Sequence, residues 1–100
     1  MSKVLPDMYN GITEITEIKL PDGFRSIEDR AFEGCSNLTK IVLPDSIEFI
    51  SDTAFKDCFA LKDIYFFGTM KQWKMLNLKD RTFLTAAATK IVCKDGYIPN

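Results

Sequence analysis

The sequence predicts an α/β repeat fold, in which similar turns of the chain stack on one another and share one core. Residues 18–40 and 41–63 align without a gap over 23 residues, and ten of the aligned positions are identical. Most of these identities are apolar residues or the Pro-Asp pair of a turn, and altered copies of the unit lie on both sides. Altered terminal units are typical of stacked repeats, because each end of the core lacks a further neighbour.

Each unit carries an apolar pattern of the form Leu-x-x-Ile-x-Leu-Pro, as in residues 38–44. Successive side chains of a strand point to opposite faces. We therefore expect Ile41 and Leu43 to point into the core and Lys40 and Val42 to point outward. A period of 23 residues with this pattern lies within the range of leucine-rich repeats.

The segments "EDRAF" (28–32) and "SDTAF" (51–55) place polar residues before a small residue and a phenylalanine. We interpret each segment as a short helical turn on the convex side of the stack. Phe32 and Phe55 are expected to fill the space between successive layers.

The chain is predicted to form one leucine-rich-repeat domain over residues 1–100. Within it we expect a truncated N-terminal cap repeat (1–17), two full repeats (18–40 and 41–63), and a partial repeat with a C-terminal cap (64–100). Altered units at both ends predict a complete array that is capped twice.

The two terminal units are the least regular parts of the chain. Deleting eight residues from the template aligns residues 5–7 with residues 20–22, since both read Leu-Pro-Asp, and this alignment predicts a shortened first turn. In the last unit, Trp73 is expected to close the end of the core. The segment "TAAAT" (85–89) fits either a helix or a loop.

The repeat "LPDSIEFISDTAFKDCFALKDI" resembles the BspA-like leucine-rich repeat, which shows an apolar strand ending in Pro, then Ile, then Ala-Phe-x-x-Cys. The tail "IYFFGTMKQWKML" followed by "ATKIVCKDGYI" is similar to the closing segment of such arrays. The resemblance covers roughly residues 15 to 98. It implies a right-handed solenoid with a parallel sheet on its concave face. It also implies protein binding, often at cell surfaces as an adhesion module.

Alignment of the strands gives two columns of outward side chains on the predicted concave face. The first column reads Glu17, Lys40, Asp63 and Lys90, and the second reads Lys19, Val42, Tyr65 and Val92. The first column places opposite charges side by side, which fixes the register of the strands and keeps the face soluble. The second column is an apolar stripe with a lysine at its end. These eight residues are the predicted partner-binding surface, because a tyrosine among apolar residues is typical of protein interfaces.

Composition excludes several other functions. A net charge of −1 with interleaved charges argues against binding to nucleic-acid phosphates. The chain has no histidine and three widely spaced cysteines, so we expect no metal, no cofactor and no catalysis. Cys35 and Cys58 occupy one repeat position and are expected to be buried. No apolar run is long enough for insertion into a membrane.

The predicted function is therefore a non-catalytic protein-binding module, expected to be a monomer or a weak homodimer. Two alternatives stay open. One is an intracellular inhibitor of a host enzyme or defence complex, encoded by a phage or mobile element. The other is a structural or self-associating unit with an exposed edge strand. Location is expected to be cytoplasmic if Met1 is the native start, and at the cell surface or secreted if the chain is a trimmed piece.

Overall fold

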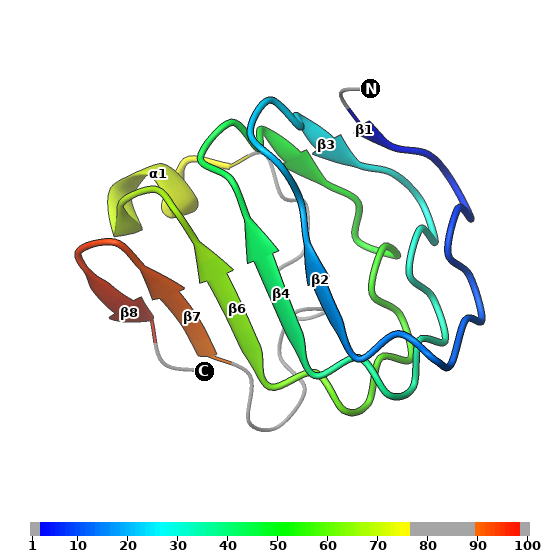
Figure 1. Ribbon diagram of the computed structural model, residues 1–100. Coiled ribbons are helices and arrows are strands. Elements are labelled where there is room, and N and C mark those ends of the chain that lie inside the picture. The colour runs from blue at the N-terminus through cyan, green and yellow to red at the C-terminus, as the bar shows by residue number, and fades with distance from the viewer. Residues whose placement is uncertain (1–2, 77–89, 99–100) are drawn as a thin grey trace.

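Successive turns of the chain stack side by side with a constant offset of 23 residues, as Figure 1 shows for the computed structural model. The structure describes residues 3–76 and 90–98. One row of strands forms a five-stranded sheet in the order β2-β4-β6-β7-β8. Its strands are β2 (Glu17–Lys19), β4 (Lys40–Leu43), β6 (Asp63–Phe66), β7 (Lys90–Cys93) and β8 (Gly96–Ile98). The first four are parallel, and β8 is antiparallel to β7.

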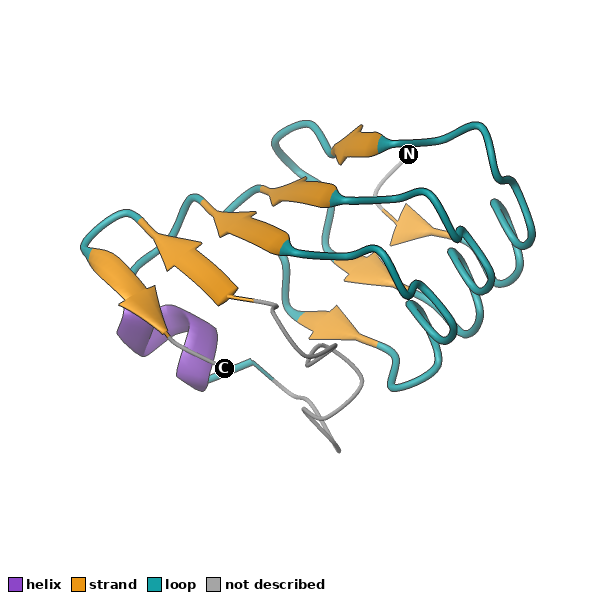
Figure 2. Ribbon diagram, turned by 90° about the horizontal axis from the view of Figure 1, so that it is seen from below, coloured by secondary structure: helices purple, strands orange, loops and turns teal. Residues whose placement is uncertain are grey.

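A second, shorter sheet lies on the other side of the core. It is three-stranded and parallel, in the order β1-β3-β5. Its members are β1 (Lys3–Val4), β3 (Ser26–Ile27) and β5 (Phe49–Ile50). Figure 2 shows the strands of the two sheets as separate rows joined by loops. Each repeat therefore contributes a strand to both sheets, whereas the sequence predicted one strand for each repeat.

The helical turns expected at residues 28–32 and 51–55 do not form helices. Both segments are runs of tight turns, and α1 (Met70–Lys74) is the helix that the structure shows within residues 3–76 and 90–98. Hydrogen bonds between neighbouring turns explain the difference. The N–H of Phe32 donates to the carbonyl of Ala54 in the next turn at 2.8 Å, so it cannot close a helical bond within its own segment.

The core lies between the two sheets and contains one column of stacked aromatic rings. Tyr9, Phe32 and Phe55 lie one above another, with ring centroids 5.3 Å apart and ring planes within 5° of parallel. One hydrophobic cluster runs from Val4 to Cys93 across all the turns. The phenylalanines therefore fill the space between layers, as the sequence predicted.

The first turn keeps the regular spacing, so the predicted deletion is wrong. Val4 pairs with Ile27, and Asp7 forms an ion pair with Arg30 at 3.1 Å, both at the 23-residue offset. Residues 5–7 therefore lie beside residues 28–30 and are not equivalent to residues 20–22. The shared Leu-Pro-Asp letters misled the alignment.

The C-terminal end of the core is closed by α1 and a hairpin. Thr69 and Gln72 form a reciprocal capping box at the start of α1, and Trp73 packs edge-on against Phe66 with only 2% of its surface exposed. The hairpin of β7 and β8 is tied to α1 by a hydrogen bond of 2.9 Å from the N–H of Met70 to Asp95. The segment 85–89, for which the sequence left two alternatives, lies outside the described residues.

Candidate functional site

The outward face of the five-stranded sheet, which we call the sheet face, carries the predicted partner-binding residues in register. Neighbouring strands align Glu17, Lys40, Asp63 and Lys90 as one column, and Lys19, Val42, Tyr65 and Val92 as the next. The register expected from the repeat is therefore confirmed at every step of both columns. Paired residues of adjacent strands lie close enough for their side chains to touch.

The charged column forms fewer ion pairs than its alternation suggests. Lys40 approaches Glu17 at 3.5 Å, which is the one ion pair within 4 Å among the column residues in the described part of the chain. The same ammonium lies 4.6 Å from the centroid of the Tyr65 ring, in cation–π geometry. Lys40 thus interacts with the strands on both sides of its own and turns away from Asp63.

Val42 contributes little accessible surface to the sheet face. Its exposure is 7%, whereas Tyr65 and Val92 are half-buried and Lys19 is exposed. The contacts of Lys40 with Glu17 and Tyr65 hold its aliphatic chain over β4, on the face where Val42 lies. A long lysine stem covers apolar surface in this way while its charged end stays in water.

Two further aromatic residues, which the sequence did not single out, extend the apolar column. Tyr97 of β8 pairs with Val92 and is 62% exposed, and Phe67 directly after β6 is 52% exposed. We call the four residues Tyr65, Phe67, Val92 and Tyr97 the aromatic patch. A shallow hollow of about 130 Å³ lies among Tyr65, Phe67 and Val92. Lys90 lies 5.8 Å from the Tyr97 ring centroid, so cations border the patch.

A local signal for Tyr97 was present in the sequence. Asp95-Gly96 precedes it, and an Asp-Gly pair between apolar runs is a strong hairpin signal. In the structure Cys93 pairs with Gly96 across a two-residue loop, which turns the chain back and places Tyr97 beside Val92. No comparable signal marks Phe67, because its exposure depends on what the rest of the fold leaves uncovered.

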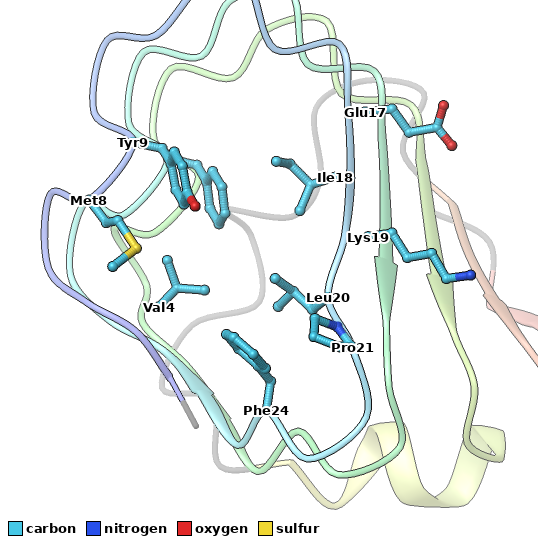
Figure 3. A pocket seen from close by; sticks show the side chains of 10 residues that line it. Val4, Met8, Tyr9, Glu17, Ile18, Lys19, Leu20, Pro21 and Phe24 are labelled. Carbon is cyan, nitrogen blue, oxygen red and sulfur yellow. The ribbon is translucent and has the colours of Figure 1, made fainter. Parts of the chain in front are cut away.

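A second hollow, of about 290 Å³, opens at the N-terminal end of the stack. Figure 3 shows that its walls are apolar side chains of the first turn and its neighbour, including Val4, Tyr9, Leu20 and Phe24. This is the end of the core that no turn covers within the described residues. The residues are core positions of the repeat, so the hollow is continuous with the core itself.

The three cysteines are buried and chemically protected. Cys35 and Cys58 lie in one column, and their Sγ atoms donate to the carbonyls of Tyr9 at 3.2 Å and Phe32 at 3.0 Å. Burial raises the pKa of all three thiols, that of Cys58 to about 12. A thiol acts as a nucleophile or metal ligand as its thiolate, which these environments disfavour.

Side chains of the metal-binding types form no group of three or more in residues 3–76 and 90–98. Over the same residues, no helix has both the length and the apolar character needed to cross a lipid bilayer.

Comparison with known proteins places these features in one family. The model of the BspA type leucine-rich repeat region matches residues 3–94. A solved structure, a leucine-rich cell surface protein from Faecalibacterium prausnitzii A2-165, superposes with a TM-score of 0.73 and 32% sequence identity. The match covers 75% of this chain and 20% of that protein, so the chain spans about a fifth of its length. The search of curated proteins found no match.

Proposed function

The chain belongs to the BspA type leucine-rich-repeat family, and from this premise we propose that it is a non-catalytic module that binds a protein partner through its sheet face. One observation carries the proposal: four neighbouring positions of the sheet face gather into the exposed aromatic patch. Tyrosine and other aromatic residues are enriched at the centres of protein interfaces, where they combine large apolar area with few rotatable bonds.

Cations border the patch and indicate the chemistry of the partner. Lys40 lies over the Tyr65 ring and Lys90 over the Tyr97 ring, while Lys94 lines the hollow beside Val92. A partner that places an apolar side chain in this hollow and carboxylates around it would complement both features. We therefore propose an apolar protein segment flanked by Asp or Glu as the bound element.

Support for a role at the cell surface comes from similarity. The solved relative is described as a cell surface protein, and the aligned part of this chain shares its fold. We propose that this chain is an adhesion-type module of the same kind. The absence of catalysis belongs to the same proposal, supported by the buried thiols and the lack of histidine.

A pair of matched variants tests the proposed binding face. Tyr65→Ala/Tyr97→Ala removes two rings of the patch, while Phe59→Ala removes an aromatic side chain that is 78% exposed outside the patch. Proteins captured by the wild-type chain from cell-surface and cytosolic extracts would be purified, and their affinities for all three chains measured by calorimetry. Circular dichroism would confirm that each variant is folded.

We expect the double variant to bind a captured partner at least about tenfold more weakly, because truncation of interface aromatics has effects of this size. The Phe59→Ala control should bind like the wild type. Equal binding by the wild type and the double variant would exclude the aromatic patch as the binding surface. A partner found only in the cytosolic fraction would contradict the adhesion role while leaving the binding face to be judged by the variants.

A further inference from the structure

We propose that the open N-terminal end of the stack binds a second copy of this chain, with β2 pairing antiparallel to β2 of the other copy about a two-fold axis at Ile18. This interface lies at one edge of the sheet, so the proposal is independent of what the sheet face binds. Four features of the first turn support it: exposed core positions, free backbone groups, complementary charges, and a closed opposite end.

The first turn leaves core positions uncovered that later turns bury. Ile18 and Leu20 are half-buried, whereas the equivalent residues Ile41 and Leu43 are 0% and 1% exposed. The hollow of about 290 Å³ lies against these same side chains, as Figure 3 shows. An apolar end of this kind is stabilised when a similar end covers it, because burial of apolar surface is favourable.

Backbone groups of β2 point out of the sheet at the same end. The N–H of Leu20 donates to Val42 at 3.0 Å, and the carbonyl of Thr16 accepts from Thr39 at 2.9 Å. Alternate residues of a strand direct their N–H and C=O groups to opposite sides. The backbone groups of Glu17 and Lys19 therefore point to the free edge, which is ready to pair with another strand.

The sequence of β2 is complementary to itself in the antiparallel direction. If Ile18 lies opposite Ile18 of the second copy, Glu17 lies opposite Lys19 of that copy, and Lys19 lies opposite its Glu17. Residues whose N–H and C=O both point outward form the hydrogen-bonded pairs of an antiparallel ladder. Each Glu17–Lys19 pair then gains two backbone hydrogen bonds and an attraction between its side chains. Figure 3 shows both side chains on the face of β2 away from the hollow, where they do not block contact between the open ends.

The other end of the stack does not offer a matching surface. Trp73 closes it with 2% exposure, and α1 and β8 lie in contact there. An open end that can meet only another open end gives a closed pair about a two-fold axis and not a filament. The two five-stranded sheets would join into one continuous sheet.

The test measures the mass of the chain against concentration by sedimentation equilibrium, for the wild type and two charge-reversal variants. Lys19→Glu places two glutamates opposite each other at both pairs, and Glu17→Lys places two lysines there. We expect each variant alone to dissociate roughly tenfold more readily than the wild type. An equimolar mixture of the two should associate again, because Lys at 17 of one chain then faces Glu at 19 of the other.

Lys56→Glu, at an exposed lysine of the opposite side, is the matched control and should behave like the wild type. Circular dichroism of each variant separates loss of association from loss of folding. A wild-type chain that stays monomeric over the whole range overturns the proposal and leaves the open end to another occupant, such as a further repeat. Association that both variants retain, or that their mixture does not restore, also overturns it.

Discussion

The ring of Phe32 stacks on the ring of Phe55 with centroids 5.3 Å apart and planes 4° from parallel. The two residues are 23 positions apart, so this stack repeats the spacing of the turns in the middle of the core. Tyr9 continues the column on the other side of Phe32. A substitution at the central ring therefore disturbs contacts in three successive turns.

We expect Phe32→Ala to destabilise the fold by about 3–5 kcal/mol, because it leaves a cavity between two rings. Tyr9 is half-buried at the open end, so Tyr9→Ala should cost less. Urea unfolding followed by circular dichroism measures both. If Phe32→Ala leaves too little folded protein, Phe32→Leu provides a milder comparison in the same order. Equal losses at both positions would contradict a column whose centre carries more of the stability than its end.

The left-handed turn at Gly34 recurs at one position of each repeat. Gly11, Gly34 and Asp57 are equivalent, with φ of 75°, 74° and 62°. An L-residue in this conformation costs roughly 1–2 kcal/mol, which glycine avoids. We expect Gly34→Ala to lower the free energy of unfolding by about 1 kcal/mol, and Asp57→Gly to leave it unchanged or to raise it. Thermal unfolding of both variants checks the prediction, and a more stable Gly34→Ala variant would contradict it.

Gly68 allows the chain to pass closely over Phe66 before α1 begins. A Cβ atom at this position would meet the Phe66 ring and lie 2.6 Å from Oε1 of Gln72, which belongs to the capping box. We expect Gly68→Ala to destabilise the cap by about 1–3 kcal/mol through overpacking. Fluorescence of Trp73, the single tryptophan of the chain, reports unfolding of this region.

Thr69→Ala is the control for that measurement, because it removes the capping hydrogen bond and adds no bulk. Its expected effect is about 0.5–2 kcal/mol. A Gly68→Ala variant with wild-type stability and wild-type fluorescence would show that the close approach is not needed.

The buried thiol of Cys58 predicts a loss of stability in alkali. Burial raises its pKa from the ordinary 9.0 to about 12. Below the pKa of the unfolded chain, both states hold the proton, and the thiol adds no dependence on pH. Between that value and the folded pKa, only the folded state keeps the proton, so the free energy of unfolding should fall by about 1.4 kcal/mol per pH unit.

Other groups titrate in the same range, so the measurement compares the wild type with Cys58→Ala. Urea unfolding at pH values from neutral to alkaline gives the free energy of unfolding of each. The decline with pH should be steeper for the wild type than for the variant. Parallel declines would mean that the thiol ionises as readily in the folded state as in the unfolded chain.

Much of the candidate site was predictable from the sequence. The aligned columns that begin at Glu17 and Lys19 follow from the repeat period and from strand alternation, both of which can be read without knowing the fold. The low exposure of Val42 could not be predicted in this way. It depends on the rotamer of Lys40, which is selected by Glu17 on one neighbouring strand and Tyr65 on the other.

The sequence by itself determined the stacking unit, its register and its buried columns, because a repeated pattern of apolar residues has one way to bury them all. Tertiary structure decided the rest. Hydrogen bonds between neighbouring turns, such as that from Phe32 to Ala54, replaced the expected helical turns with a second sheet. The hairpin after Cys93 placed Tyr97 on the sheet face. These outcomes depend on which groups of distant segments meet, and the order of residues in one segment does not contain that information.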